Sequence, residues 1–253
     1  MLHDMTKRMT RGTLLVFISV LTTACGTQQD QIGPALDAPG RSQADLERDS
    51  RSKPHEVLIF FGATRGMVVL DLFAGSGYYS EILGNVVGDS GKVYMHNNQA
   101  YLGFAGKALE ERLGSGRVRN VVRYDREIDA IDLPEDSVDM VLMIMTYHDL
   151  YYETDGWSID PEAFFAMLHR VLKPGGTLAI VDHVAVAGTG SSAAQDLHRI
   201  DPEFARQDIE SRGFRLAGTS DALNNSDDAL DVVVFDPKVQ GKTSKFVYRF
   251  TSP

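Results

Sequence analysis

The chain has 253 residues, of which 43% are hydrophobic and 24% are charged, a composition typical of a folded globular protein with a substantial core. The formal net charge is −10 and the sequence shows no basic face, so we expect no nucleic-acid partner. The single cysteine, Cys25, excludes an internal disulfide.

The first 25 residues have the pattern of a bacterial export signal. A basic stretch at residues 7–11 precedes an apolar run at residues 14–21, which is too short to span a bilayer. The residues before Cys25 resemble a lipobox, which implies a signal peptide over residues 1–24 and a lipidated, palmitate-bearing cysteine. Gly26 is typical of lipoproteins sorted to the outer membrane, so the resemblance implies a membrane-anchored protein of the cell envelope, on its periplasmic face. The alternative is an ordinary cleaved signal peptide with a chance cysteine.

Two further segments precede the first expected strand. Residues 25–44 are rich in Gln, Pro, Gly, Ala and Asp with little apolar periodicity, which predicts a flexible tether. The folded domain is expected to cover residues 45–253. Residues 45–61 have a helical pattern that Pro54 should interrupt.

The stretch from Val68 to Ser80 organises the rest of the chain. An apolar run containing Asp71 predicts a buried strand, Gly75 and Gly77 predict a tight turn, and Tyr78 can begin a helix. A helix N-terminus beyond a strand of an open α/β sheet is a place where ligands bind.

This stretch resembles motif I of the class I S-adenosylmethionine-dependent methyltransferases, in which an apolar strand and an acid precede G-x-G. The resemblance implies that the backbone of Gly75, Ser76 and Gly77 binds the cofactor S-adenosylmethionine, and that Asp71 fixes the loop. A helix before this motif covers the cofactor pocket in related enzymes, so Arg51 or Lys53 is a candidate to reach the site; a solvated face is the alternative.

The next strand, expected at residues 92–96, departs from the family. Class I methyltransferases carry an acid at its end that binds the ribose hydroxyls, whereas this chain has Asn97 and Asn98. An amide side chain can still bond a hydroxyl, although more weakly than a carboxylate. For the adenine edge, the resemblance implies Asp129 in a D-A-x-x-L-P-like segment, with Asp125 as the alternative and a plain surface loop as a further one.

A strongly apolar run at residues 137–145 predicts the fourth strand, and the sequence T-Y-H-D-L-Y-Y follows it. His148 in this segment is our candidate general base, because an unperturbed histidine titrates near neutrality and Asp149 or Asp182 can orient it. A structural histidine is the alternative. His148, His183 and His198 match no compact zinc motif, so we assign no metal site and favour an acid–base cluster or plain packing.

Residues 161–172 have helical spacing after Asp160 as cap, and K-P-G-G precedes a fifth strand at residues 177–181. The string L-H-R-V-L-K-P-G-G-T-L-A-I-V-D closely matches the family segment before strand five. Three later segments are candidates for the two strands that close the sheet, so one of them is in excess: residues 214–217, 231–235 and 245–250. We therefore expect an α/β, doubly wound, mostly parallel seven-stranded sheet of the Rossmann-like class I methyltransferase type.

The pattern over residues 45–250 also resembles a group of exported bacterial methyltransferase-like proteins, with a Y-H-D-L segment and a D-H…L-H-R-I-D-P tail. The resemblance implies methyl transfer from S-adenosylmethionine to a small-molecule acceptor. The alternative is an envelope lipoprotein that uses the fold to bind a small molecule without catalysis.

Overall fold

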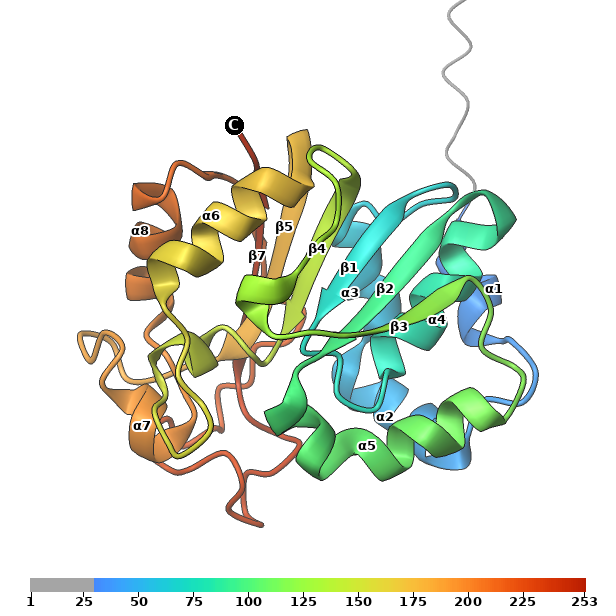
Figure 1. Cartoon of the computed structure of the whole chain (residues 1–253). Helices are drawn as coiled ribbons and strands as arrows, with labels where there is room; N and C mark the ends of the chain where they lie inside the picture. The colour runs from blue at the N-terminus through green and yellow to red at the C-terminus, as the bar shows by residue number, and fades with distance from the viewer. Residues whose placement is uncertain (1–29) are drawn as a thin grey trace, which may run out of the picture.

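The computed structural model describes residues 30–253, and a seven-stranded sheet in the order β3-β2-β1-β4-β5-β7-β6 forms its centre (Figure 1). All neighbouring strands are parallel except in the two pairs that contain β7. The predicted doubly wound, mostly parallel sheet is thus confirmed. The strands are β1 (Val68–Leu72), β2 (Lys92–Asn97), β3 (Val121–Asp125), β4 (Val138–Ile144), β5 (Leu172–His183), β6 (Arg215–Ser220) and β7 (Lys245–Thr251).

Helices precede, connect and cover these strands. The α-helices are α1 (Ile32–Leu36), α2 (Gln43–Ser52), α3 (Pro54–Phe61), α4 (Tyr78–Val87), α5 (Gln99–Gly114), α6 (Pro161–Val171), α7 (Ala193–Leu197) and α8 (Pro202–Ser211). Three short 3-10 helices are η1 (Gly88–Ser90), η2 (Ile128–Ala130) and η3 (His148–Tyr151). The predicted caps Asp160 and Asp201 each accept a hydrogen bond from a backbone N–H of the first turn.

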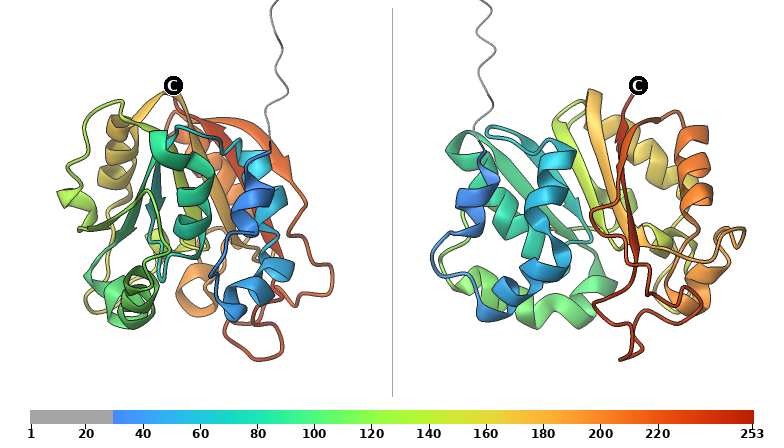
Figure 2. Two further views of the ribbon diagram at one scale, coloured as in Figure 1. Left: turned by 90° about the vertical axis from the view of Figure 1, so that its right-hand side faces the viewer. Right: turned by 180° about the vertical axis from the view of Figure 1, so that it is seen from behind.

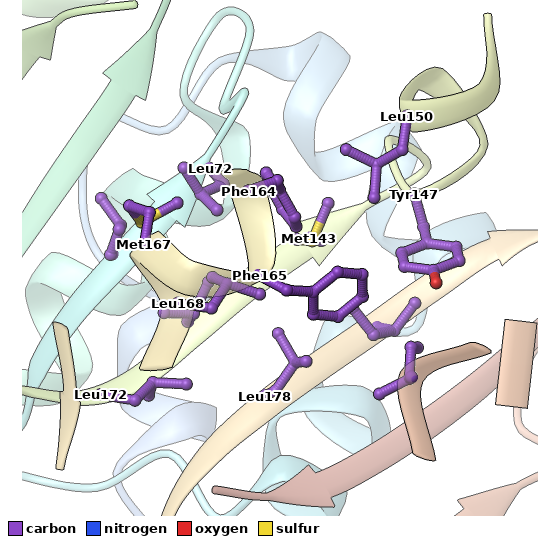
Figure 3. Close-up of a cluster of buried hydrophobic side chains, with 14 of the residues drawn as sticks. Leu72, Met143, Tyr147, Leu150, Phe164, Phe165, Met167, Leu168, Leu172 and Leu178 are labelled. Carbon is purple, nitrogen blue, oxygen red and sulfur yellow. The ribbon is translucent and has the colours of Figure 1, made fainter. Parts of the chain in front are cut away.

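The sheet is buried on both faces, as the apolar strand sequences require. On one face, Leu72 and Met143 pack against Phe164 and Leu168 of α6 (Figure 3). On the other face, Val69 and Met140 pack with residues of α1, α3 and α4. Alternate residues of β1 therefore serve two separate hydrophobic clusters, so the sheet cannot slip by one residue without exposing both of them.

The folded domain includes residues that the sequence predicts to be a tether. Residues 30–44 were expected to be part of a flexible tether, but Ile32 and Ala35 of α1 are buried in the cluster beneath α3 and α4. Two apolar side chains in one turn are enough to dock a short helix, although they are too few to create a visible periodicity. The expected helix over residues 45–61 is indeed divided before Pro54. Cys25 and the predicted signal peptide lie outside the described residues.

The parallel strands end at one edge of the sheet, called the carboxyl edge below, and several segments cover it. In both views of Figure 2 the long connection at residues 221–244 lies beside α2 at this lower edge. The expected strand at residues 231–235 belongs to this irregular connection, and β6 and β7 alone close the sheet. Among residues 30–253, no helix combines the length and apolar character needed to cross a bilayer.

Candidate functional site

The turn between β1 and α4 lies at the carboxyl edge, where Gly75 and Gly77 both have positive φ angles of 58° and 81°. The side chain of Asn97 at the end of β2 holds this turn: its Oδ1 accepts from the Gly75 N–H at 2.8 Å, and its Nδ2 donates to the Gly75 carbonyl at 3.0 Å. Arg112 of α5 donates to the Ser76 carbonyl at 2.6 Å. The turn is therefore fixed from two neighbouring elements.

The two glycines serve different purposes. A Cβ atom added to Gly77 would lie 2.4 Å from the Met95 sulfur, whereas a Cβ atom on Gly75 would meet no atom within 4 Å. Gly77 is therefore needed for close packing of the turn against β2. Gly75 borders open space, as expected where a ligand approaches the backbone.

A buried ionic network braces this turn from α2. Arg112 forms ion pairs with Asp45 of α2 and Glu81 of α4, and all three side chains are nearly inaccessible to solvent. Arg117 binds the same Glu81 carboxylate at 2.8 Å. Helix α2 is thereby tied through Arg112 to the glycine turn.

The amide side chains of Asn97 and Asn98 both form hydrogen bonds within the protein. Both amide atoms of Asn97 are engaged by Gly75, and the side chain is fully buried. Asn98 caps α5, accepting from the Tyr101 N–H, and its amide nitrogen donates to Glu127. Both amide groups are therefore engaged by the glycine turn and by the start of α5, so their predicted contact with a ribose hydroxyl would have to use the remaining capacity of the amide atoms.

The adenine-edge prediction also changes. Asp129 lies exposed in η2, and its carboxylate has no hydrogen bond or ion pair within residues 30–253. Asp125, the alternative, ends β3 beside Asn97, and Arg123 binds its Oδ2 at 2.6 Å. Of the two residues, Asp125 is the one at the carboxyl edge.

Within the described part of the chain, two buried side-chain oxygens lack a hydrogen-bond partner: Oδ1 of Asp125 and Oγ1 of Thr146. Asp125 is the last residue of β3 and Thr146 lies two residues beyond β4, so both lie at the carboxyl edge. Buried polar atoms are nearly always paired in folded proteins, so each of these two oxygens can still accept a hydrogen bond from water or from a polar ligand.

An aromatic cluster around Phe73 lies beside the turn and was not predicted from the sequence. The Phe73 ring lies 5.2 Å from His96, 5.0 Å from Tyr101 and 5.2 Å from Trp157, measured between ring centroids. Phe73 has a φ angle of 53°, which is strained for a bulky residue. The one available signal was a large aromatic residue between a strand and a glycine turn, but its partners come from three separate segments.

Asp71, which was expected to fix the glycine turn, contacts the first turn of α4 instead. Its side chain is 2% exposed and accepts a hydrogen bond from Ser80 Oγ at 2.5 Å, which joins β1 to α4. Burial raises the pKa of Asp71 to about 7, so the carboxyl group is partly protonated at neutral pH.

His148 is buried between two carboxylates. It is 3% exposed, its Nδ1 lies 2.8 Å from Asp182 Oδ1, and its Nε2 lies 3.2 Å from Asp149 Oδ1. Burial alone would lower the pKa of His148, but the Asp182 charge and hydrogen bonds to both carboxylates outweigh it and raise the pKa to about 10. Because both ring nitrogens face carboxylates, this arrangement does not favour a general base, and that role for His148 stays a prediction.

The three histidines singled out from the sequence separate into a group and a neighbour. His148, Asp149 and His198 bring one donor atom each within 4.8 Å of one another. His183 lies 6.1 Å from His148 between ring centroids, and its Nδ1 is 2.8 Å from the Thr243 hydroxyl. The structure therefore joins the T-Y-H-D segment to the distant L-H-R-I-D-P segment.

Two adjoining cavities of about 290 and 240 Å³ lie between α2, the ends of β4 and β5, and residues 221–244. No Asp or Glu of the described part of the chain lines either cavity. Their linings share Arg51, Leu223, Gly241 and Lys245, and the further cations in them are Arg48, Lys53 and Lys242.

Arg51 and Lys245 are central to these cavities. Arg51, one of the two cations predicted to reach the site, has a guanidinium without hydrogen bond or ion pair inside residues 30–253. Burial lowers the pKa of Lys245 to about 8, so its ammonium group remains mostly charged at neutral pH. The net charge of the chain is −10, so a cavity lining with cations and no carboxylate differs from the acidic character of the chain as a whole.

Comparison with known proteins agrees with this architecture. The methyltransferase domain family matches the chain over residues 70–180. The ubiquinone/menaquinone biosynthesis C-methyltransferase of Shewanella oneidensis is 30% identical over 122 residues, which are 48% of this chain and 44% of that protein. The chain thus spans about half the length of the curated relatives it matches.

Solved structures cover more of the chain. A SAM-dependent methyltransferase from Aquifex aeolicus superposes with a TM-score of 0.58 at 24% identity, over 81% of this chain and 98% of that one. Geranyl diphosphate C-methyltransferase from Streptomyces coelicolor has the same TM-score at 13% identity, over 86% and 88%. The [4+2]-cyclase SpnF follows with a TM-score of 0.56 at 14% identity, over 88% and 93%. At these identities the likeness shows the fold, which is the Rossmann-like class I methyltransferase fold.

Proposed function

We propose that this protein is an S-adenosylmethionine-dependent methyltransferase whose acceptor is an anionic small molecule. The observation that carries the cofactor assignment is the braced glycine turn after β1. Gly75 borders open space, Asn97 and Arg112 hold the turn rigid, and the turn lies within the segment matched by the methyltransferase domain family.

The residues at this edge fit the cofactor in two further respects. The Asp125 Oδ1, which has no hydrogen-bond partner within residues 30–253, is an unused acceptor beside Asn97 that suits a hydroxyl or amino group of an adenosyl compound. The N-terminus of α4 directs its free N–H groups and positive dipole end toward the turn, which suits the carboxylate of the methionine part. The cofactor supplies an already activated methyl group, so the task left to the protein is alignment of the acceptor.

Calorimetry on the purified chain with S-adenosylmethionine and S-adenosylhomocysteine tests the assignment. We expect micromolar binding that is lost in Gly75→Val, because the side chain fills the space that the ligand needs. Gly116→Val is the matched control, since Gly116 also has a positive φ angle, of 71°, and open space at its Cβ position. Absence of binding at millimolar ligand by the folded wild-type chain would contradict the proposal and favour a non-catalytic small-molecule binder. Two features are consistent with that alternative: the bulky Phe73 cluster beside the turn and the missing acid for the ribose hydroxyls.

The anionic acceptor is inferred from the cavity cations. Binding a carboxylate or phosphate there would pair Arg51 and Lys245, which no carboxylate of the cavity lining neutralises. Methyl transfer from labelled cofactor should occur to small carboxylates or phosphates and fail with their neutral amides or esters. Arg51→Gln should raise the acceptor KM, while Lys107→Gln on the exposed side of α5 serves as the charge-matched control. Equal transfer to acids and amides would refute the anionic class without touching the cofactor assignment.

The proposal places the protein in the bacterial cell envelope, anchored through a lipid on Cys25. Its support is the basic, apolar and lipobox-like order of the first 25 residues. Cys25→Ser should release the protein from membranes upon cell fractionation. Membrane association of that variant equal to the wild type would contradict the anchor.

A further inference from the structure

The group formed by His148, Asp149 and His198 has the composition of a metal centre rather than of an ordinary ion pair. His148 Nε2 lies 3.2 Å and His198 Nδ1 lies 3.9 Å from Asp149 Oδ1, and all three donor atoms lie within 4.8 Å of one another. Ligand atoms around a four-coordinate Zn²⁺ with bonds of about 2.0–2.2 Å are about 3.3 Å apart. Small rotations of the side chains would close the difference.

Each of two donors is held in place by a second residue from another element. Asp182 at the end of β5 accepts from His148 twice, from the backbone N–H at 2.7 Å and at Nδ1 at 2.8 Å, which directs Nε2 toward Asp149. Tyr101 of α5 donates to Asp149 Oδ2 at 2.7 Å and leaves Oδ1 for the group. Carboxylate or hydroxyl partners that orient ligating residues in this way are typical of metal sites.

The local charge points in the same direction. Asp149 and Asp182 are two carboxylates with 12% and 0% side-chain exposure, and a single imidazolium at His148 can balance only one of their two negative charges. Arg199, which follows His198 in the sequence, pairs with Asp228 and not with Asp149 or Asp182. The Lys245 ammonium donates to the Thr243 carbonyl. Buried charges require a partner or a bound metal ion, and one divalent cation would neutralise both carboxylates.

We propose that His148 Nε2, Asp149 Oδ1 and His198 Nδ1 bind one divalent first-row transition metal, with Zn²⁺ as the best-suited ion. Two imidazoles and one carboxylate favour such ions over Mg²⁺ or Ca²⁺, which prefer oxygen ligands. Three protein ligands leave a position open for water or for an anionic group of a small molecule. The His198 side chain is 21% exposed and marks the side from which the ion enters. The site does not depend on the assignment of methyl transfer.

The test uses the full chain, freed of metal with a chelator and then titrated with Zn²⁺ and Co²⁺. We expect one equivalent to bind, with visible d–d absorption of Co²⁺ that indicates mixed nitrogen and oxygen ligands. His198→Ala should weaken binding at least 100-fold, and Tyr101→Phe should weaken it by about 10–100-fold through loss of the outer hydrogen bond. His55→Ala is the matched control, because His55 also contacts one carboxylate, Asp30 at 2.8 Å, but has no third donor beside it among residues 30–253.

Three results would overturn the proposal. They are no stoichiometric binding by the folded wild-type chain, equal binding by wild type and His198→Ala, or an equal loss in His55→Ala. Circular dichroism of each variant checks that the fold is kept, and His198→Gln replaces the alanine variant if that one unfolds. A purely ionic cluster would leave the thermal midpoint unchanged by Zn²⁺ and chelator alike.

Discussion

Replacing Arg199 by alanine should lower the free energy of unfolding by about 3–5 kcal/mol, because the Asp228 carboxylate then stays buried without its partner. Both side chains are fully inaccessible, and the guanidinium binds Asp228 at 2.7 and 3.0 Å. It also donates to the carbonyls of Val232 and Val184, which the substitution leaves unpaired. The pair therefore anchors residues 221–244, the segment that closes one side of the cavities.

Urea unfolding followed by far-UV circular dichroism measures the effect. With a slope of about 2–3 kcal/mol per molar urea, the midpoint should fall by about 1–2.5 M. Arg206→Ala is the control, because Arg206 pairs with Glu203 and Glu210 on the surface of α8, where ion pairs contribute at most about 1 kcal/mol.

A double variant separates the pair from its surroundings. Arg199→Met with Asp228→Leu removes both buried charges, so it should recover part of the lost stability relative to Arg199→Ala. Equal midpoints for Arg199→Ala and Arg206→Ala would refute the reasoning, since a buried partnerless carboxylate would then cost no more than an exposed one.

Two further predictions concern the turn and the strand before it. Gly77→Ala should destabilise the protein by about 1–3 kcal/mol more than Gly75→Ala, because only the former drives a methyl group against the buried Met95 sulfur; equal thermal midpoints would contradict the packing argument. Burial raises the pKa of Asp71 to about 7 from 3.8 in the unfolded chain, so the folded state binds the extra proton between these values. Stability should therefore fall as pH rises from about 4 to 7, by up to roughly 4 kcal/mol at 1.36 kcal/mol per pH unit. The difference in unfolding free energy between wild type and Asp71→Asn, measured across this range, should show the slope, and a constant difference would exclude it.

Much of the fold follows from short-range patterns. The apolar runs of β1 and β4, the caps Asp160 and Asp201, and the break before Pro54 are local features whose physical consequences do not depend on distant residues. Strand order follows from the sequence only through resemblance to known folds, and the choice of β6 and β7 over residues 231–235 required the packed structure.

The site shows where local reasoning ends. Asn97 was correctly placed at the edge of the sheet, but the backbone of Gly75, 22 residues away, takes up its amide group. His148 was correctly placed after β4, but two carboxylates, one of them from β5, change its protonation. Whether a polar side chain is free to bind a ligand depends on which other groups of the folded protein already form hydrogen bonds with it, and those groups can be distant in sequence.

By itself, the sequence determined that a strand, a glycine turn and a helix meet at one point, because each is dictated by neighbouring residues. Tertiary structure decided that Phe73 packs in an aromatic cluster beside that turn, and that five cations line two adjoining cavities in an acidic protein. It also decided that His198 meets His148 and Asp149 across fifty residues of chain. These outcomes depend on the burial and pairing of residues far apart in sequence, for which no local pattern of side chains carries the information.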